Sequence, residues 1–215
     1  MKTIQFILDN CIETPGQFDI QIAKYLVPTL SAYAIEYAEL RAYPDIDGGG
    51  RTEFLLGRGF EINDNIVIWN SFICNISQTD ELPVLIVHYY GIRDYRLLFP
   101  AISSENRRDR LAKYYEEAEK CFDIGAWLSF MLMCGAIFEG LLYDRLGSDS
   151  IKKFNELIKN AGLKGLISNN EVKLFDRVRT YRNIVHLGNT DYYVKRMDVM
   201  DTRKVLDEIV IRFSK

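Results

Sequence analysis

A short run of residues near position 180 combines side chains that could take part in chemistry. Arg182, Asn183 and His186 lie three, four and seven positions after Arg179, so a helix would align all four on one polar stripe. Guanidinium groups pair with anions, and histidine titrates near neutral pH. The stripe therefore joins groups suited to anion binding with a group suited to proton transfer.

The same residues also have a purely structural interpretation. The helix that contains them is expected to end at Leu187, just before Gly188. Positive side chains in the last turn of a helix are stabilised by the negative end of the helix dipole. The arginines and the histidine could therefore be favourable without any ligand.

Five segments of helix length follow one another in the second half of the chain and predict a helical bundle. They are Arg107–Cys121, Ile124–Leu146, Ile151–Asn160 with Ser150 as its cap, a helix from Asn169 or Asn170 to Leu187, and a helix starting at Asp201 or Thr202. The second segment is long enough to span a membrane, but its glycines and Glu139 favour a buried core helix. We therefore expect no membrane contact.

The first half of the chain mixes strand and helix signals, so the sequence predicts an α+β domain followed by the bundle. The strand signals are Ile66–Trp69, Pro83–Tyr90 and, as the return strand of a hairpin, Tyr95–Phe99. Phe18, Ile22, Tyr25 and Leu26 recur at helical spacing and predict a helix between Pro15 and Pro28. Pro100, Ser103 and Ser104 mark the boundary, which divides the chain into residues 1–104 and 105–215.

Charge divides the chain at the same place. Residues 1–104 hold 7 Lys and Arg against 13 Asp and Glu, whereas residues 105–215 hold 20 against 17, giving net charges of −6 and +3. A mildly positive second half suits an anionic ligand but is far from the basic balance of a dedicated nucleic-acid binder. The four cysteines form no paired motif, so we expect no metal and no cofactor. No targeting signal is visible in the sequence, so we expect reduced thiols in a cytoplasmic protein.

The second half resembles the HEPN superfamily (higher eukaryotes and prokaryotes nucleotide-binding). HEPN domains are helical bundles in which an arginine precedes a histidine by four to six residues near the end of a late helix, often with an asparagine after an arginine. Six residues separate Arg179 from His186, and Asn183 directly follows Arg182. The gap from Arg182 to His186 is only three, which leaves open which arginine has the family role. The apolar segment around Glu139 also resembles the second long helix of the family.

The resemblance implies a metal-independent endoribonuclease that acts on RNA as a homodimer. By resemblance, His186 would transfer protons, Arg179 or Arg182 would bind the phosphate, and Asn183 would contact the nucleotide or orient His186. It further implies a toxin or an anti-phage defence effector, with an antitoxin or regulatory protein as a partner. The alternative is a non-catalytic HEPN-like module that binds nucleotide or protein.

Several residues outside the stripe are supporting candidates or weaker ones. Glu139 could form an ion pair with Arg179 or Arg182 and order the site. Tyr192, Tyr193, Lys195 and Arg196 place aromatic rings beside cations, a combination that binds RNA but also occurs in solvated loops. His88 lies in an apolar strand and is expected to be a sheet-face histidine, while Gly48–Gly50 and Gly57–Gly59 are expected to be turns rather than phosphate loops.

Overall fold

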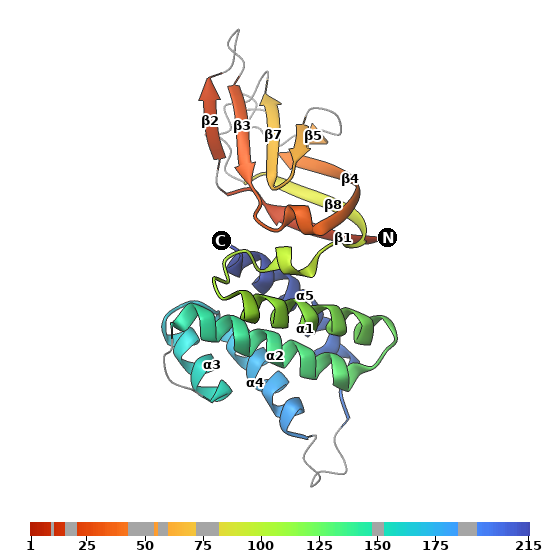
Figure 1. The fold of residues 1–215 in the computed structure, drawn as a ribbon, viewed down its shortest axis with the longest axis vertical. Coiled ribbons are helices and arrows are strands. Elements are labelled where there is room, and N and C mark those ends of the chain that lie inside the picture. Colours follow the sequence, from red (N-terminus) through yellow and green to blue (C-terminus); the bar gives the residue numbers. More distant parts are fainter. Residues whose placement is uncertain are drawn as a thin grey trace, which may run out of the picture. The chain divides into compact units, whose positions relative to one another are not determined.

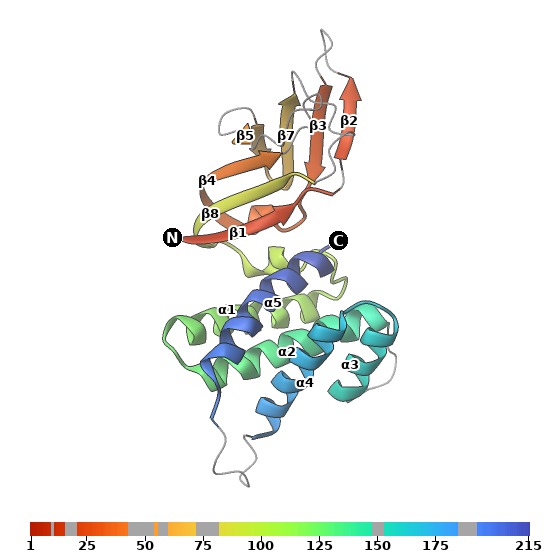
Figure 2. The same ribbon diagram turned by 180° about the vertical axis from the view of Figure 1, so that it is seen from behind.

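The computed structural model describes residues 1–9, 11–15, 21–42, 54–55, 60–71, 82–147, 153–184 and 193–215. The chain divides into two compact units, Met1–Leu97 and Leu98–Lys215. The described part of the first unit consists of strands and short 3₁₀ turns, and that of the second contains five α-helices (Figures 1 and 2).

The described strands of the first unit form two antiparallel sheets of four strands each. One sheet has the order β1 (Lys2–Ile7), β8 (Val84–Ile92), β4 (Tyr33–Ala42) and β5 (Phe54–Leu55). The other has the order β2 (Cys11–Pro15), β3 (Gln21–Leu26), β7 (Ile66–Ser71) and β6 (Phe60–Asn63). The predicted strands at Ile66–Trp69 and Pro83–Tyr90 are therefore confirmed.

Aromatic side chains form the centre of the first sheet because alternate residues point to the same face. On β1, Ile4 and Phe6 are buried whereas Gln5 and Ile7 are exposed. The ring of Tyr33 packs edge-on against Phe6 at 5.8 Å and against Tyr89 at 4.9 Å between ring centroids. These perpendicular arrangements are favoured by the charge distribution of aromatic rings.

Two local predictions for this unit are wrong. A helix was expected between Pro15 and Pro28, but the described residues Gln21–Leu26 of this segment form the strand β3. Tyr25 is buried and Leu26 is exposed, an alternation that suits a strand paired with β2 and β7 on its two sides. Phe18 lies outside the described residues.

The expected return strand after Gly91 is also absent, because β8 continues through Gly91 to Ile92 and Tyr95–Leu98 forms a 3₁₀ turn. The Asp94 side chain accepts a hydrogen bond from the backbone N–H of Arg96 at 2.8 Å, and its carbonyl accepts one from Leu97 at 3.2 Å. Aspartate favours such local turns over a strand.

Five helices make up the described part of the second unit, as predicted. They are α1 (Glu105–Asp123), α2 (Trp127–Leu146), α3 (Phe154–Leu163), α4 (Asn169–Ile184) and α5 (Arg196–Phe213). The helix α2 contacts each of the other four. Its buried residues include Phe130, Cys134, Phe138 and Leu142, so it is the central helix of this unit.

The length and apolar composition of α2 would also allow it to cross a membrane. Its burial among the other helices accounts for this composition, because a helix that is apolar on most sides is typical of a protein core. Cys134 is fully buried, and burial raises the pKa of its thiol well above the ordinary value. It therefore packs as an apolar core residue.

The starts of α3, α4 and α5 differ from the predicted starts, and α5 begins at Arg196 rather than at Asp201 or Thr202. Lys153, not Ser150, precedes α3, and residues 148–152 lie outside the described part of the chain. Ser168 rather than Asn169 or Asn170 caps α4. The Glu171 carboxylate accepts a hydrogen bond from the Ser168 N–H at 2.6 Å, and Ser168 Oγ accepts one from the Glu171 N–H at 3.3 Å. This reciprocal pattern is a capping box.

Acidification should weaken the helical unit through Glu171. Burial raises its pKa, but hydrogen bonds from Ser168 and Arg212 outweigh that effect, so the pKa lies below its ordinary value. Glu171 therefore stabilises the fold above the pKa that it has in the unfolded chain, and this contribution is lost as the pH falls through the lower folded-state pKa. We expect Glu171→Gln to lower the free energy of unfolding at neutral pH and to differ little from wild type in acid. Urea unfolding at several pH values measures this, and an equal loss at every pH would contradict it.

Candidate functional site

The C-terminal part of α4 carries the polar stripe identified in the sequence. Val178 and Tyr181 of this helix are buried, whereas Arg182 and Asn183 are exposed and Arg179 is half-buried. The helix therefore separates an inward apolar face from an outward polar one, as its spacing predicts. His186, Leu187 and Gly188 lie outside the described residues.

The two arginines of the stripe have different partners. Arg182 Nη1 donates a hydrogen bond to Glu139 Oε2 on α2, forming an ion pair between the two helices. Arg179 instead pairs with Asp176 of its own helix, at 2.7 Å between Arg179 Nη2 and Asp176 Oδ1. The ion pair expected for Glu139 is thus present, and its partner is Arg182.

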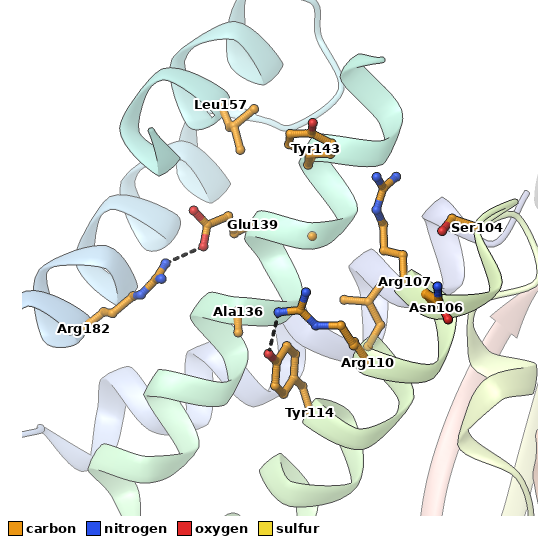
Figure 3. Close-up of a pocket in the computed structure, with 12 residues that line it drawn as sticks. Ser104, Asn106, Arg107, Arg110, Tyr114, Ala136, Glu139, Tyr143, Leu157 and Arg182 are labelled. Atoms are coloured by element: carbon orange, nitrogen blue, oxygen red, sulfur yellow. Dashed lines mark hydrogen bonds and ion pairs between the residues drawn. The ribbon is translucent and has the colours of Figure 1, made fainter. Parts of the chain in front are cut away.

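Arg182 and Glu139 line a pocket of about 510 Å³ to which α1, α2, α3 and α4 all contribute. Figure 3 shows Arg182 and Glu139 on one side of it and two arginines of α1 on the other. The lining residues are Ser104, Asn106, Arg107, Arg110, Leu111, Tyr114, Ala136, Glu139, Gly140, Tyr143, Leu157 and Arg182. Among these, three arginines face one carboxylate, so the lining carries a net charge of +2.

The two arginines of α1 that line the pocket, Arg107 and Arg110, each contact a tyrosine there. The guanidinium of Arg107 lies 4.9 Å from the centroid of the Tyr143 ring and forms a 2.6 Å ion pair with Asp144. Arg110 donates a hydrogen bond of 3.1 Å to the hydroxyl of Tyr114. Such contacts restrict two long side chains and keep their charges at the pocket.

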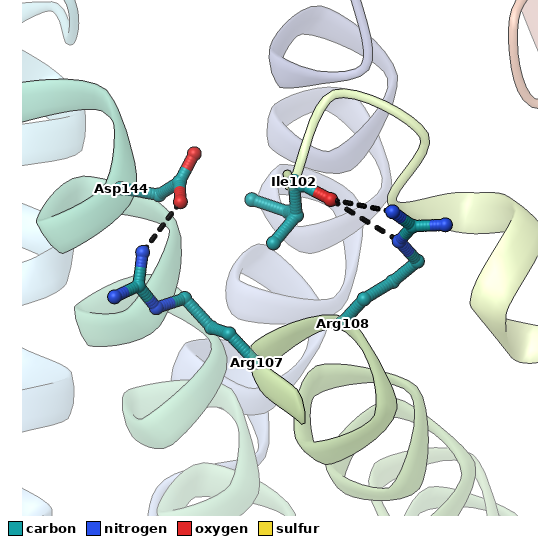
Figure 4. A network of polar contacts seen from close by, with 4 residues as sticks. All are labelled: Ile102, Arg107, Arg108 and Asp144. Carbon is teal, nitrogen blue, oxygen red and sulfur yellow. Dashed lines mark hydrogen bonds and ion pairs between the residues drawn. The ribbon is translucent and has the colours of Figure 1, made fainter. Parts of the chain in front are cut away.

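Arg108 follows Arg107 directly but has a different role. Two of its guanidinium nitrogens donate hydrogen bonds of 3.1 and 2.9 Å to the carbonyl of Ile102. Figure 4 shows Arg107 reaching toward Asp144 while Arg108 reaches toward the segment that leads into α1. Adjacent residues of a helix point about 100° apart, so Arg107 lines the pocket whereas Arg108 does not.

A glycine lets α1 approach α2 closely beside the pocket. A Cβ atom at Gly140 would lie 2.8 Å from Cδ2 of Leu111, which is closer than carbon atoms pack. Leu111 is 1% exposed and so has little room to move. The absence of a side chain at Gly140 therefore helps to define the shape of the pocket.

Two of the four aromatic and basic residues predicted to bind RNA after α4 line a different pocket. Tyr193 and Lys195 line a second hollow of about 710 Å³ between α4 and the start of α5. Arg196 is the first residue of α5, and Tyr192 lies outside the described residues. The structure thus brings Tyr193 and Lys195 together but not into the pocket of Arg182.

A buried carboxylate beside this second hollow joins α4 to α5. Asp198 is 8% exposed, and it accepts hydrogen bonds of 2.5 Å from both the Tyr181 hydroxyl and Arg177 Nη1. Burial and the hydrogen bond to Asp198 raise the pKa of Tyr181, so this hydroxyl remains a donor at neutral pH. Asp198 therefore helps to fix the helix that carries the polar stripe.

Replacing Asp198 with alanine should destabilise the helical unit. The change removes the carboxylate that accepts a hydrogen bond from the buried Tyr181 hydroxyl, and it removes a negative charge from the first turn of α5, at a cost of about 2 kcal/mol. Urea unfolding followed by the helical signal of circular dichroism measures the loss. Asp201→Ala, at an exposed position of the same helix, is the matched control and should change little. Equal effects of the two substitutions would contradict the anchoring role.

The histidine of the first unit has the sheet-face environment that we expect. His88 stacks on Tyr37 at 4.2 Å between ring centroids, and its Nδ1 lies 3.2 Å from Thr3 Oγ1. Its Nε2 lies 3.7 Å from Glu39 Oε1. Gly48–Gly50 and Gly57–Gly59 lie outside the described residues, so their predicted turns stay predictions.

The pocket includes residues that the sequence reasoning did not select. Arg107, Arg110 and Tyr114 lie three and four positions apart, a spacing that places them on one face of α1. That spacing could have identified the face, but nothing in the sequence shows that it meets Glu139 and Tyr143 of α2.

The chain was compared with protein-family models, curated proteins and solved structures. No protein-family model, no curated protein and no solved structure matches the chain.

Proposed function

We propose that the helical unit binds RNA at the pocket of Arg182 and cleaves it, as a HEPN-type endoribonuclease. The observation that carries the proposal is the position of Arg182, which precedes Asn183 in the HEPN-like motif and lines a pocket with Arg107 and Arg110. Three guanidinium groups against one carboxylate suit a phosphodiester, which arginine binds through paired N–H donors.

The proposed reaction uses the side chains of two copies of the motif and the 2′-hydroxyl of the RNA itself. The ribose 2′-oxygen attacks the adjacent phosphorus, its proton passes to a base, and the bond from phosphorus to the 5′-oxygen breaks. The 5′-oxygen takes a proton from an acid, so the products are a 2′,3′-cyclic phosphate and a 5′-hydroxyl. Arginine stabilises the charge that develops on the phosphate oxygens, and Arg182 is better placed for this role than Arg179, which is outside the pocket lining.

Two histidines are needed if one is the base and the other the acid. We propose a homodimer in which His186 and the partner's His186 share one cleft, as the family resemblance implies. The acidic first unit would then restrain the nuclease or bind a regulatory partner such as an antitoxin. This arrangement suits a cytoplasmic toxin or anti-phage defence effector.

The second candidate function is a non-catalytic module that binds nucleotide or protein. The observation that favours it is that both arginines of the stripe already have carboxylate partners, Glu139 and Asp176. Ion pairs of this kind also occur where arginine has only a structural role. Asn183 and His186 would then contribute to binding or to the end of α4.

Incubation with end-labelled RNA distinguishes the two functions. The purified full chain is mixed with RNA in buffer containing a metal chelator, and the ends of any fragments are analysed. A nuclease of the proposed type yields fragments that end in 2′,3′-cyclic phosphate. RNA that remains intact but bound supports the non-catalytic module and contradicts cleavage.

A further inference from the structure

Arg110 differs from the other two arginines of the pocket in its charge environment. Arg107 pairs with Asp144 and Arg182 pairs with Glu139, but Arg110 forms no ion pair with a carboxylate in the described part of the chain. Its hydrogen-bond partner is the neutral hydroxyl of Tyr114. Arg110 therefore offers a positive charge that an anion can contact without displacing a carboxylate.

The residues around Arg110 add a second cation and two aromatic rings to the same part of the pocket. Arg107 lies one helical turn away on the same face of α1 and is held over the ring of Tyr143. Tyr114 holds the guanidinium of Arg110, and both tyrosines line the same pocket. Aromatic rings beside arginine planes are the surfaces on which unpaired RNA bases stack. The part of the pocket around Arg107 and Arg110 thus combines cations with aromatic surfaces on which bases can stack.

We propose that Arg110 and Arg107, with Tyr114 and Tyr143, form a phosphate-binding subsite for a nucleotide, separate from the phosphate contact of Arg182. Its ligand is a nucleotide phosphate, carried either by an RNA strand or by a free mononucleotide. The identification of RNA rests on the proposed function, whereas nucleotide binding at Arg110 does not require cleavage. In a nuclease this subsite would hold the strand beside the scissile bond.

Binding can be separated from cleavage by blocking the attacking group. The probe is a short fluorescein-labelled oligoribonucleotide with 2′-O-methyl groups, which cannot undergo attack by the 2′-oxygen. Fluorescence anisotropy gives its Kd for the full-length wild type, Arg110→Ala and Lys113→Ala. Lys113 is an exposed cation of α1 outside the pocket lining, so its variant has the same charge change at a different place. Circular dichroism verifies that both variants remain folded.

Arg110→Ala should weaken probe binding roughly five- to tenfold, as expected for one charge-assisted contact at an exposed position. Because one phosphate contact is lost, the slope of log K against log salt concentration should fall by about 0.7 for a single strand. Lys113→Ala should change neither quantity. Competition with adenosine monophosphate then identifies the source of the phosphate. Displacement that depends on Arg110 indicates a free nucleotide, and its absence indicates a strand.

The results that would contradict the phosphate-binding subsite differ from those that would contradict the proposed RNA cleavage. If wild type binds the methylated probe through Arg110 but leaves ordinary RNA intact, the subsite stands and the nuclease does not. If ordinary RNA is cut while Arg110→Ala and Lys113→Ala bind the probe as tightly as wild type, the subsite is refuted. The subsite is likewise refuted if neither probe nor mononucleotide binds.

Discussion

Alanine in place of His186 is expected to lower the rate of RNA cleavage by roughly 100-fold or more, because general acid–base catalysis contributes about that much. The chelator-containing assay with labelled RNA measures this rate at several pH values. Wild type should show a bell-shaped profile, since His186 must be neutral as a base and protonated as an acid. The profile should flatten in His186→Ala.

Two controls separate a chemical role of His186 from a structural one. His88→Ala removes the other histidine of the chain, which stacks on Tyr37 in the first unit, and should leave the rate unchanged. Added imidazole should restore part of the activity of His186→Ala, because it can replace a missing proton-transfer group but not a missing packing contact. Cleavage by His186→Ala at the wild-type rate would exclude the proposed mechanism.

Truncation of Phe138 to alanine is expected to cost about 3–5 kcal/mol of the free energy of unfolding. Phe138 on α2 and Phe175 on α4 are both fully buried, and their rings stack at 4.0 Å with an angle of 11° between their planes. The substitution removes most of a buried ring and leaves a cavity between these helices. Urea unfolding followed by the helical signal of circular dichroism measures the effect.

Two further variants calibrate this result. Phe138→Leu keeps most of the apolar volume and should cost about 1 kcal/mol. Leu163→Ala alters a side chain that is 77% exposed at the end of α3 and should change stability by less than about 0.5 kcal/mol. A Phe138→Ala loss no larger than that of Leu163→Ala would mean that the two rings do not hold α4 on α2.

The helices were predictable because their buried residues recur at helical spacing, and this spacing can be recognised within each segment without knowledge of its neighbours. Ile158 of α3 and Leu206 of α5, for example, occupy apolar positions at helical spacing, and both are buried. Helix ends were less predictable, because several residues compete for each cap. The sequence Ser168-Asn-Asn-Glu171 is a capping box in itself and could have been preferred to the two asparagines.

The errors in the first unit arise where structure depends on distant partners. The spacing of Ile22, Tyr25 and Leu26 is compatible with a helix, and only pairing with β2 and β7 makes this segment a strand. The pocket likewise depends on residues that are distant from one another in the sequence. Glu139 and Arg182 are 43 residues apart, and the sequence suggested that they form an ion pair. It did not show that Arg107 and Arg110 of a third helix, α1, line the same pocket.

Gly140 has a consequence for how chains of this kind can diverge in evolution. Since a Cβ atom there would meet Cδ2 of Leu111 at 2.8 Å, a side chain at position 140 would change the packing of position 111. A descendant that keeps the pocket arginines and gains a side chain at position 140 must either shift the Leu111 side chain or have a smaller residue at position 111. Coupled substitution at these two uncharged positions would then reshape the ligand space while leaving every charge in place, which offers natural selection a way to change ligand size without rebuilding the site.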